Sequence, residues 1–211
     1  LSSAGPAQTM AMAGPAHFDI EAVRRLRNLR CKGSAAKLNL VLKAAPVIAG
    51  LGPDLMRARL LIAPSVASVE RAFNPAKYGE LPKRPTIEFV LPTLSDPGLS
   101  TTGQHVLSAV LSHVSHAPCG GWSDETRDEM IRRAVATLEE YAPGLSALID
   151  HQSLLTPADI ETRTGAPGGH WHHAEMGLDQ VLTLRPAHGL SHYRFPVAGL
   201  YLCGASAHPG G

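Results

Sequence analysis

The sequence predicts an α+β fold, in which a mixed, largely antiparallel sheet of five to seven strands is flanked by helices. Several short segments alternate apolar and polar residues, which is typical of strands with one buried face. Other segments place apolar residues three or four positions apart, behind a residue that can cap a helix. Strand-like and helix-like segments do not alternate regularly, so the pattern does not favour a parallel βαβ architecture.

Four helices are predicted from this spacing and from their end signals. Residues 1–18 precede them and are rich in Gly, Pro and Ala, which predicts a flexible lead-in. The first predicted helix is 18–30, with Asp19 at its start, and the second is 65–79, which Ser65 caps and Asn74-Pro75 interrupts. The third is 123–144, which Ser123 caps and Pro143-Gly144 ends. The fourth is 156–165, with Thr156 as its cap and Pro157 at the first helical position.

Strands are predicted where apolar residues alternate with polar ones or form short runs bounded by turn residues. Residues 96–103 (DPGLSTTG) are predicted to be a turn. The predicted strands and apolar runs are 37–43, 58–64, 86–92, 105–116, 148–156, 181–186 and 199–204.

The bulk composition excludes several classes of protein. Hydrophobic residues make up 44% and charged residues 18%, which is typical of a folded globular chain. No apolar run approaches the roughly 18 residues of a membrane-spanning helix, so no transmembrane segment is expected. The net charge of +1 gives no indication of a nucleic-acid partner. Three cysteines far apart favour neither a disulfide framework nor a cysteine-based zinc site, and fit a reducing compartment.

The most informative segment is GLYLCGASAHPGG, at residues 199–211. An apolar run leads directly into a loop with three glycines. Such a loop lets main-chain N–H groups approach an anion closely, because no Cβ atom intervenes. A flexible, Gly-rich strand end is the alternative.

This segment resembles the C-terminal flavin-binding signature of phytoene-desaturase-like FAD-dependent oxidoreductases, and is most similar to the branch of pyridine nucleotide-disulfide oxidoreductase domain-containing proteins. Other segments resemble the family in the same order, from about residue 20 to the end. They are KGSAAKLNLVL (32–42), residues 62–108, GGWSDETRDEM (120–130), LEEYAPG (138–144) and residues 154–186.

The resemblance implies the C-terminal, mainly substrate-domain half of such an enzyme, because no G-x-G-x-x-G turn opens the chain. Residues 19–198 would form the substrate domain, and residues 199–211 would begin a truncated FAD-binding segment. FAD would be the cofactor of the parent protein, and this chain alone is not expected to retain it. Ala205 stands where wider relatives carry an acid, so contacts there would come from the main chain. The implied cofactor-binding residues are Gly204, Ala205, Ser206, His208, Pro209, Gly210 and Gly211.

A second candidate segment is GGHWHHAEMGLDQ, at residues 168–180. In a strand, His170 and His172 would face one side while His173 and Glu175 faced the other, so convergence on a metal ion would need a bend. The alternative is a solvated polar loop without a binding or catalytic role, and no metal ligand is assigned. Relatives carry a GG-N-x-x-H-x-E-like segment here, which implies that His173 and Glu175 lie near the flavin.

The resemblance implies that His173 donates or accepts a proton, and that Glu175 orients it. Four further residues are candidates for lining the substrate cavity: Trp171, Asp179, Gln180 and Arg185. A packing role is the alternative for Trp171, and a structural salt bridge is the alternative for Arg185.

The leading hypothesis is therefore part of an FAD-dependent oxidoreductase that passes a hydride between an apolar small-molecule substrate and flavin. The missing Rossmann half would be supplied in cis or in trans, and a homo-oligomer is a further hypothesis. The expected compartment is the cytoplasm, or the mitochondrial matrix in a eukaryote. Two alternatives from other classes remain: a non-catalytic binding or assembly module, and a metalloprotein that uses the His-rich loop.

Overall fold

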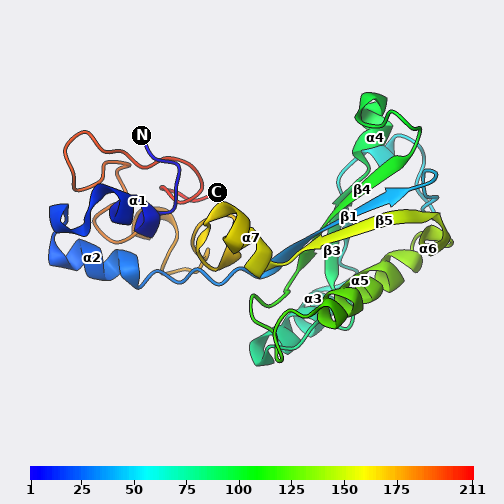
Figure 1. The fold of residues 1–211 in the computed structure, drawn as a ribbon, viewed down its shortest axis with the longest axis horizontal. Coiled ribbons are helices and arrows are strands. Elements are labelled where there is room, and N and C mark those ends of the chain that lie inside the picture. Colours follow the sequence, from blue (N-terminus) through cyan, green and yellow to red (C-terminus); the bar gives the residue numbers. More distant parts are fainter. The chain divides into compact units, whose positions relative to one another are not determined.

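The computed structural model describes residues 1–211, and the chain divides into two compact units (Figure 1). Unit 1 consists of Leu1–Gly33 and Pro157–Gly211, and unit 2 consists of Ser34–Thr156. Unit 1 is thus assembled from both ends of the chain. The observed boundaries differ from the predicted ones, which treated residues 19–198 as a single domain.

Unit 2 is built on a five-stranded sheet in which all neighbouring strands are antiparallel. The strand order is β2-β3-β4-β1-β5. The strands are β1 (Ala35–Leu42), β2 (Leu60–Ile62), β3 (Thr86–Val90), β4 (His105–Ser112) and β5 (Ile149–Leu155). The predicted α+β class is confirmed. The sheet has five strands, which is the lowest number in the predicted range of five to seven.

Two helices, α3 (Val66–Phe73) and α5 (Asp124–Glu139), lie along the same face of this sheet (Figure 1). Because side chains alternate along a strand, every second residue of β1 points into that layer and is fully buried: Leu38, Leu40 and Leu42. Met130, Ala134 and Leu138 of α5 belong to the same core. Burial of each leucine stabilises the unit by about 1.5–3 kcal/mol. The unit also contains the short helices α4 (Pro92–Ser95) and α6 (Leu145–Leu148).

The predicted caps of α3 and α5 are confirmed. The Ser123 hydroxyl accepts a hydrogen bond from the Thr126 main-chain N–H at 3.2 Å, and Ser65 accepts one from Ser68 at 3.1 Å. Helix α5 ends at Glu139, before the predicted stop, because the Glu139 carboxylate accepts the main-chain N–H groups of the following turn. Strand β4 ends at Ser112, since His113 has a left-handed φ of 65° that a strand cannot continue.

Unit 1 contains α1 (Pro6–Ala13), α2 (Ile20–Arg27), α7 (Pro157–Thr164) and long loops. Asp19 caps α2 as predicted, accepting a hydrogen bond from the Ala22 N–H at 2.8 Å. The prediction of a flexible lead-in over residues 1–18 is wrong. These residues include α1, whose Met10 is buried in one cluster with Leu26 and Phe195.

The two strands predicted late in the chain are not formed. Leu182 has a φ of 56°, and residues 182–184 form a 3-10 turn. Residues 199–204 make only isolated bridges, from Leu202 to Ser2 and from Tyr201 to Arg194. Leu200 and Leu202 belong to the core of unit 1, but no neighbouring strand of matching length pairs with this run, so the apolar pattern alone does not produce a strand.

No helix of the structure has both the length and the apolar character needed to cross a membrane.

Candidate functional site

Arg185 lies at the centre of the polar contacts of unit 1 and is 1% exposed. Its Nε donates to the Ala205 carbonyl at 2.8 Å, and its Nη2 donates to the His172 carbonyl at 2.6 Å. Further bonds reach the carbonyls of Ala174, Glu175 and Gln180. This one side chain therefore joins the His-rich segment to the C-terminal Gly-rich segment.

The partners of Arg185 are main-chain carbonyls, and no carboxylate pairs with it. The predicted alternative of a structural salt bridge is therefore wrong, because Arg185 bonds main-chain carbonyls and not a carboxylate. The structural role of Arg185 is nevertheless observed. Burial lowers the pKa of Arg185. Because its donors are satisfied inside the chain, the guanidinium offers no free N–H group to a substrate.

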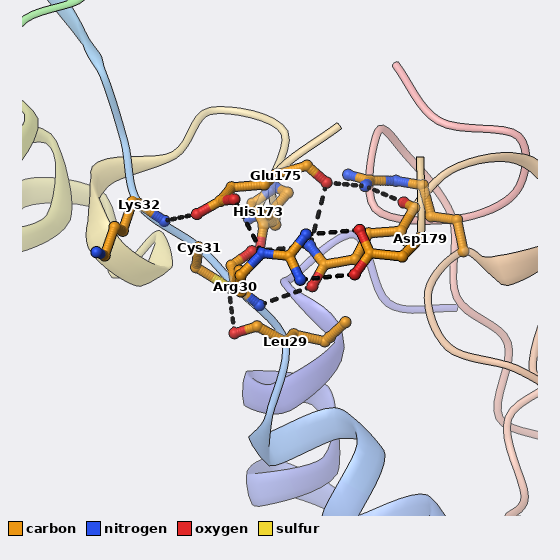
Figure 2. Close-up of polar contacts among 9 residues, drawn as sticks. Leu29, Arg30, Cys31, Lys32, His173, Glu175 and Asp179 are labelled. Atoms are coloured by element: carbon orange, nitrogen blue, oxygen red, sulfur yellow. Dashed lines mark hydrogen bonds and ion pairs between the residues drawn. The ribbon is translucent and has the colours of Figure 1, made fainter. Parts of the chain in front are cut away.

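A second arginine, Arg30, holds the far end of the His-rich segment. Figure 2 shows its guanidinium between two carboxylates: both terminal nitrogens donate to Asp179 at 2.6 Å, and Nε donates to Glu175 at 3.2 Å. The buried Gln180 amide accepts the Arg30 main-chain N–H at 2.8 Å and donates to its carbonyl at 3.0 Å. Sequence reasoning missed Arg30, since a contact across about 150 residues of chain leaves no periodic signal.

Arg30 also sets the charge state of this region. Its hydrogen bonds to Asp179 lower the pKa of that carboxyl to about 2. The second oxygen of Glu175 accepts the Lys32 main-chain N–H at 3.1 Å. Glu175 thus binds residues 30–32, and it does not hydrogen-bond to the His173 ring as the prediction required.

His173 occupies a left-handed backbone position, with a φ of 60°, where its main-chain N–H donates to the His170 carbonyl at 2.7 Å. Its ring Nδ1 is buried and has no hydrogen-bond partner. Burial, and then the positive charge of Arg185, lower the pKa of His173. The ring is therefore favoured in its neutral form, which can accept a proton.

The other two histidines of the segment do not converge with His173 on a metal position. The His172 main-chain N–H donates to His170 Nδ1 at 3.2 Å, which occupies that ring nitrogen, while His172 Nδ1 is buried without a partner. Burial lowers the pKa of both His170 and His172. No group of three or more His, Cys, Asp or Glu side chains is placed to hold a metal ion.

The remaining cavity candidate, Trp171, is 47% exposed and contacts the edge of the His172 ring. Of the four predicted cavity residues, Trp171 and Asp179 are exposed, whereas Gln180 and Arg185 are buried within hydrogen-bond networks.

The C-terminal Gly-rich segment carries unused hydrogen-bonding groups. Within residues 204–211, the Ala207 main-chain N–H donates to the Gly204 carbonyl at 3.0 Å, and the N–H groups of the other non-proline residues make no hydrogen bond within the chain. The Ser206 hydroxyl is fully buried and also has no partner. His208 is engaged, because its Nδ1 lies 2.9 Å from the Leu182 carbonyl.

Close packing joins this segment to the His-rich one. A Cβ atom added at Gly211 would lie 2.4 Å from the Ala205 Cβ and 2.8 Å from His172 Nδ1, so only glycine fits there. The unsatisfied His172 nitrogen therefore lies against the Gly-rich segment, and the structure brings together two segments that the sequence singled out separately.

Comparison with known proteins identifies the family. The chain is 34% identical to pyridine nucleotide-disulfide oxidoreductase domain-containing protein 2 of Rattus norvegicus over 222 residues, which cover 100% of this chain and 38% of that protein. This chain belongs to the phytoene-desaturase-like oxidoreductase family. The mouse protein of the same name is 38% identical over 145 residues, or 68% of this chain. The chain thus spans little more than a third of the length of the rat relative.

Two further proteins are similar over part of the chain or in fold. A lycopene-forming phytoene desaturase of Pseudescherichia vulneris is 34% identical over 122 residues, which cover 56% of this chain and 24% of that enzyme. The crystal structure of an oxidoreductase from Methanosarcina mazei shares the fold, with a TM-score of 0.53 and 18% identity over 98% of this chain and 37% of that one. No family model matches the chain.

Proposed function

We propose that this chain is the C-terminal portion of an FAD-dependent oxidoreductase, and that unit 1 contributes part of the flavin site. The observation that carries the proposal is the set of unused polar groups along residues 204–211. The buried Ser206 hydroxyl and the adjacent His172 Nδ1 lack partners, and the main-chain N–H groups other than that of Ala207 make no hydrogen bond within the chain. A buried polar group without a partner costs about 1–3 kcal/mol, so a ligand with a polar edge would be favoured there.

The residues present fit FAD in chemistry. Its phosphates and ring carbonyls are acceptors that suit main-chain N–H groups near glycines. Ala205 supplies no carboxylate, so the donors of the main chain, Ser206 and His172 would hold the cofactor. When bound, FAD supplies the hydride-accepting chemistry, while the protein positions the substrate.

His173 is proposed as the residue that holds or accepts a proton at its Nδ1, since burial and Arg185 favour its neutral form. Glu175 would act indirectly, by fixing residues 30–32, whose Cys31 thiol donates to the His173 carbonyl at 3.3 Å. Asp179 and Gln180 hold Arg30 and complete this support, and the exposed Trp171 would wall the cavity.

Unit 2 would be the substrate domain. The face of its sheet opposite α3 and α5 would contact an apolar small molecule. The rest of the flavin site, the dinucleotide-binding domain, would come from another part of the protein or from a partner chain, so this chain alone is expected to be inactive.

Titration with FAD tests the proposal. The full-length protein should bind FAD stoichiometrically, and the isolated 211-residue chain should bind it far more weakly. In the full-length protein, Ser206→Ala should weaken FAD binding by about tenfold, because a hydrogen bond worth about 1 kcal/mol or more is lost.

The control is Ser95→Ala, at an exposed serine of unit 2. The unfolding temperature of the isolated Ser206→Ala chain should not fall and is expected to rise slightly, since the variant removes a buried hydroxyl that has no partner there. Equal FAD affinities for Ser206→Ala and Ser95→Ala would contradict the assignment of Ser206. Tight binding by the isolated chain would contradict the division of the flavin site.

A further inference from the structure

We infer that the helix-free face of the unit 2 sheet binds an apolar molecule that ends in a carboxylate, and that Lys37 recognises this carboxylate. The inference rests on the proposed function, because it names the substrate class of that oxidoreductase. It is carried by the strand register, by the contacts of Lys37 and by the distribution of charge on this face.

Strand β1 alternates between the two faces of the sheet. Leu38, Leu40 and Leu42 point into the helix-covered core, so Lys37, Asn39 and Val41 point to the opposite face. Directly paired residues of antiparallel strands share a face. The register therefore adds the partners of these three residues on β4 and β5 to that face: Val110, Ser108 and Val106, and Leu155, Ser153 and His151.

Lys37 lies among apolar neighbours on this face. Its direct partners are Val110 on β4 and Leu155 on β5, and Val41 pairs with Val106 one row away. Valine and leucine side chains that remain half-buried without a covering helix form a surface that suits an apolar ligand.

The Lys37 ammonium is held in place by a short polar chain. Its Nζ donates to the Ser108 hydroxyl at 2.6 Å, and Ser108 donates in turn to the Asn39 side-chain oxygen at 3.1 Å. A lysine ammonium has three donors. Two of them are therefore left for a ligand, at a position fixed by Ser108 and Asn39.

No carboxylate of the chain forms an ion pair with Lys37. The acid whose charge acts on it, Glu88, is itself paired with Arg59 at 3.2 Å. Lys37 is half-buried, and this partial burial lowers its pKa. An unpaired, partly desolvated cation between apolar side chains is complementary to an anionic group on an apolar body.

The test uses the flavin-loaded full-length protein and three probes of equal chain length: decanoate, decanol and decylammonium. Calorimetry should show that decanoate binds about tenfold more tightly than decanol, a difference of about 1.4 kcal/mol, because the Lys37 ammonium forms a charge-assisted hydrogen bond with the carboxylate. Decylammonium should bind most weakly, since its charge is repelled by Lys37. Lys37→Met should remove the preference for decanoate.

Two further variants separate recognition from folding. Lys43→Met, at an exposed lysine just after β1, should keep the full preference. Ser108→Ala should reduce it, because the ammonium loses its orienting partner. If Lys37→Met fails to fold, the probe affinities of the wild-type protein and of Ser108→Ala still test whether this face recognises a carboxylate. Equal affinities for decanoate and decanol, or a preference that survives in Lys37→Met, would overturn the inference. Flavin absorbance of the same samples tests the proposed function separately.

Discussion

A buried arginine without a carboxylate partner is costly unless its donors find acceptors, and main-chain carbonyls supply them for Arg185. Those carbonyls come from two segments that contain every candidate cofactor-binding and catalytic residue. The geometry of the site therefore depends on a residue that touches no ligand in the proposed function.

We predict that Arg185→Met destabilises unit 1 by about 3 kcal/mol or more, since several buried carbonyls lose a charged donor together. The measurement is urea unfolding followed by the fluorescence of Trp171, in a chain whose other tryptophan is replaced (Trp122→Phe). Arg57→Met, at an exposed arginine of unit 2, should change the midpoint little. A midpoint that is equal in both variants would show that the carbonyl contacts contribute no stability.

The Arg30–Asp179 pair predicts a pH dependence. The Asp179 pKa of about 2 lies below its ordinary 3.8, so the pair's stabilisation is complete above about pH 4 and is lost as the pH falls toward 2. Carbon-13 NMR titration of the Asp179 carboxyl should show this low pKa. In Arg30→Gln the pKa should rise toward 3.8. An unchanged titration would mean that Arg30 does not hold the carboxylate in solution.

Sequence reasoning identified the segments of the site but not the contacts within them. The His-rich and Gly-rich segments were recognised by composition and family resemblance. The pairing of Glu175 with Arg30 was missed, because the partners lie far apart in sequence and a carboxylate can pair with any accessible cation.

At the scale of elements, prediction succeeded where a local signal and a tertiary partner agreed. Helix α5 has a capping serine and an apolar stripe that meets the sheet, and the strands of unit 2 have neighbours on which to pair. The apolar runs at 181–186 and 199–204 carry a strand-like pattern but lack such neighbours, so they form turns and isolated bridges. Helix α1 was missed since it is short, begins with Pro6 and lies between Gly5 and Gly14, which together resemble a loop.

The main chain at Gly169 lies close against the main chain at Pro157, so adding one methyl group at Gly169 should have a strong effect. A Cβ atom there would lie 1.8 Å from the Pro157 carbonyl oxygen, and φ is +66°. Gly169→Ala should therefore cost about 3 kcal/mol or more, since overpacking adds to left-handed strain. Gly165→Ala has a similar φ of +69° but open space around it, so it should cost about 1 kcal/mol. Thermal unfolding of both variants checks this, and equal losses would contradict the packing argument.

At the scale of the whole molecule, unit 2 is one uninterrupted stretch of chain whose two ends are brought together by the pairing of Lys37 with Leu155. We predict that residues 34–156 fold alone, because they contain a complete core and an intact sheet. A cooperative thermal transition by circular dichroism, with dispersed NMR signals, is the expected result. A chain that stays unfolded would show that unit 2 needs unit 1.

The contribution of both chain ends to unit 1 has a consequence for biosynthesis. Unit 2 can complete its core once Thr156 has left the ribosome, whereas Phe18 must wait for Phe195, and Ser2 for Leu202. Helices α1 and α2 are thus synthesised before unit 2 but buried after it. A nascent chain interrupted between the two events would carry a folded unit 2, while the side chains of Met10, Phe18 and Leu26 stayed accessible to chaperones and proteases.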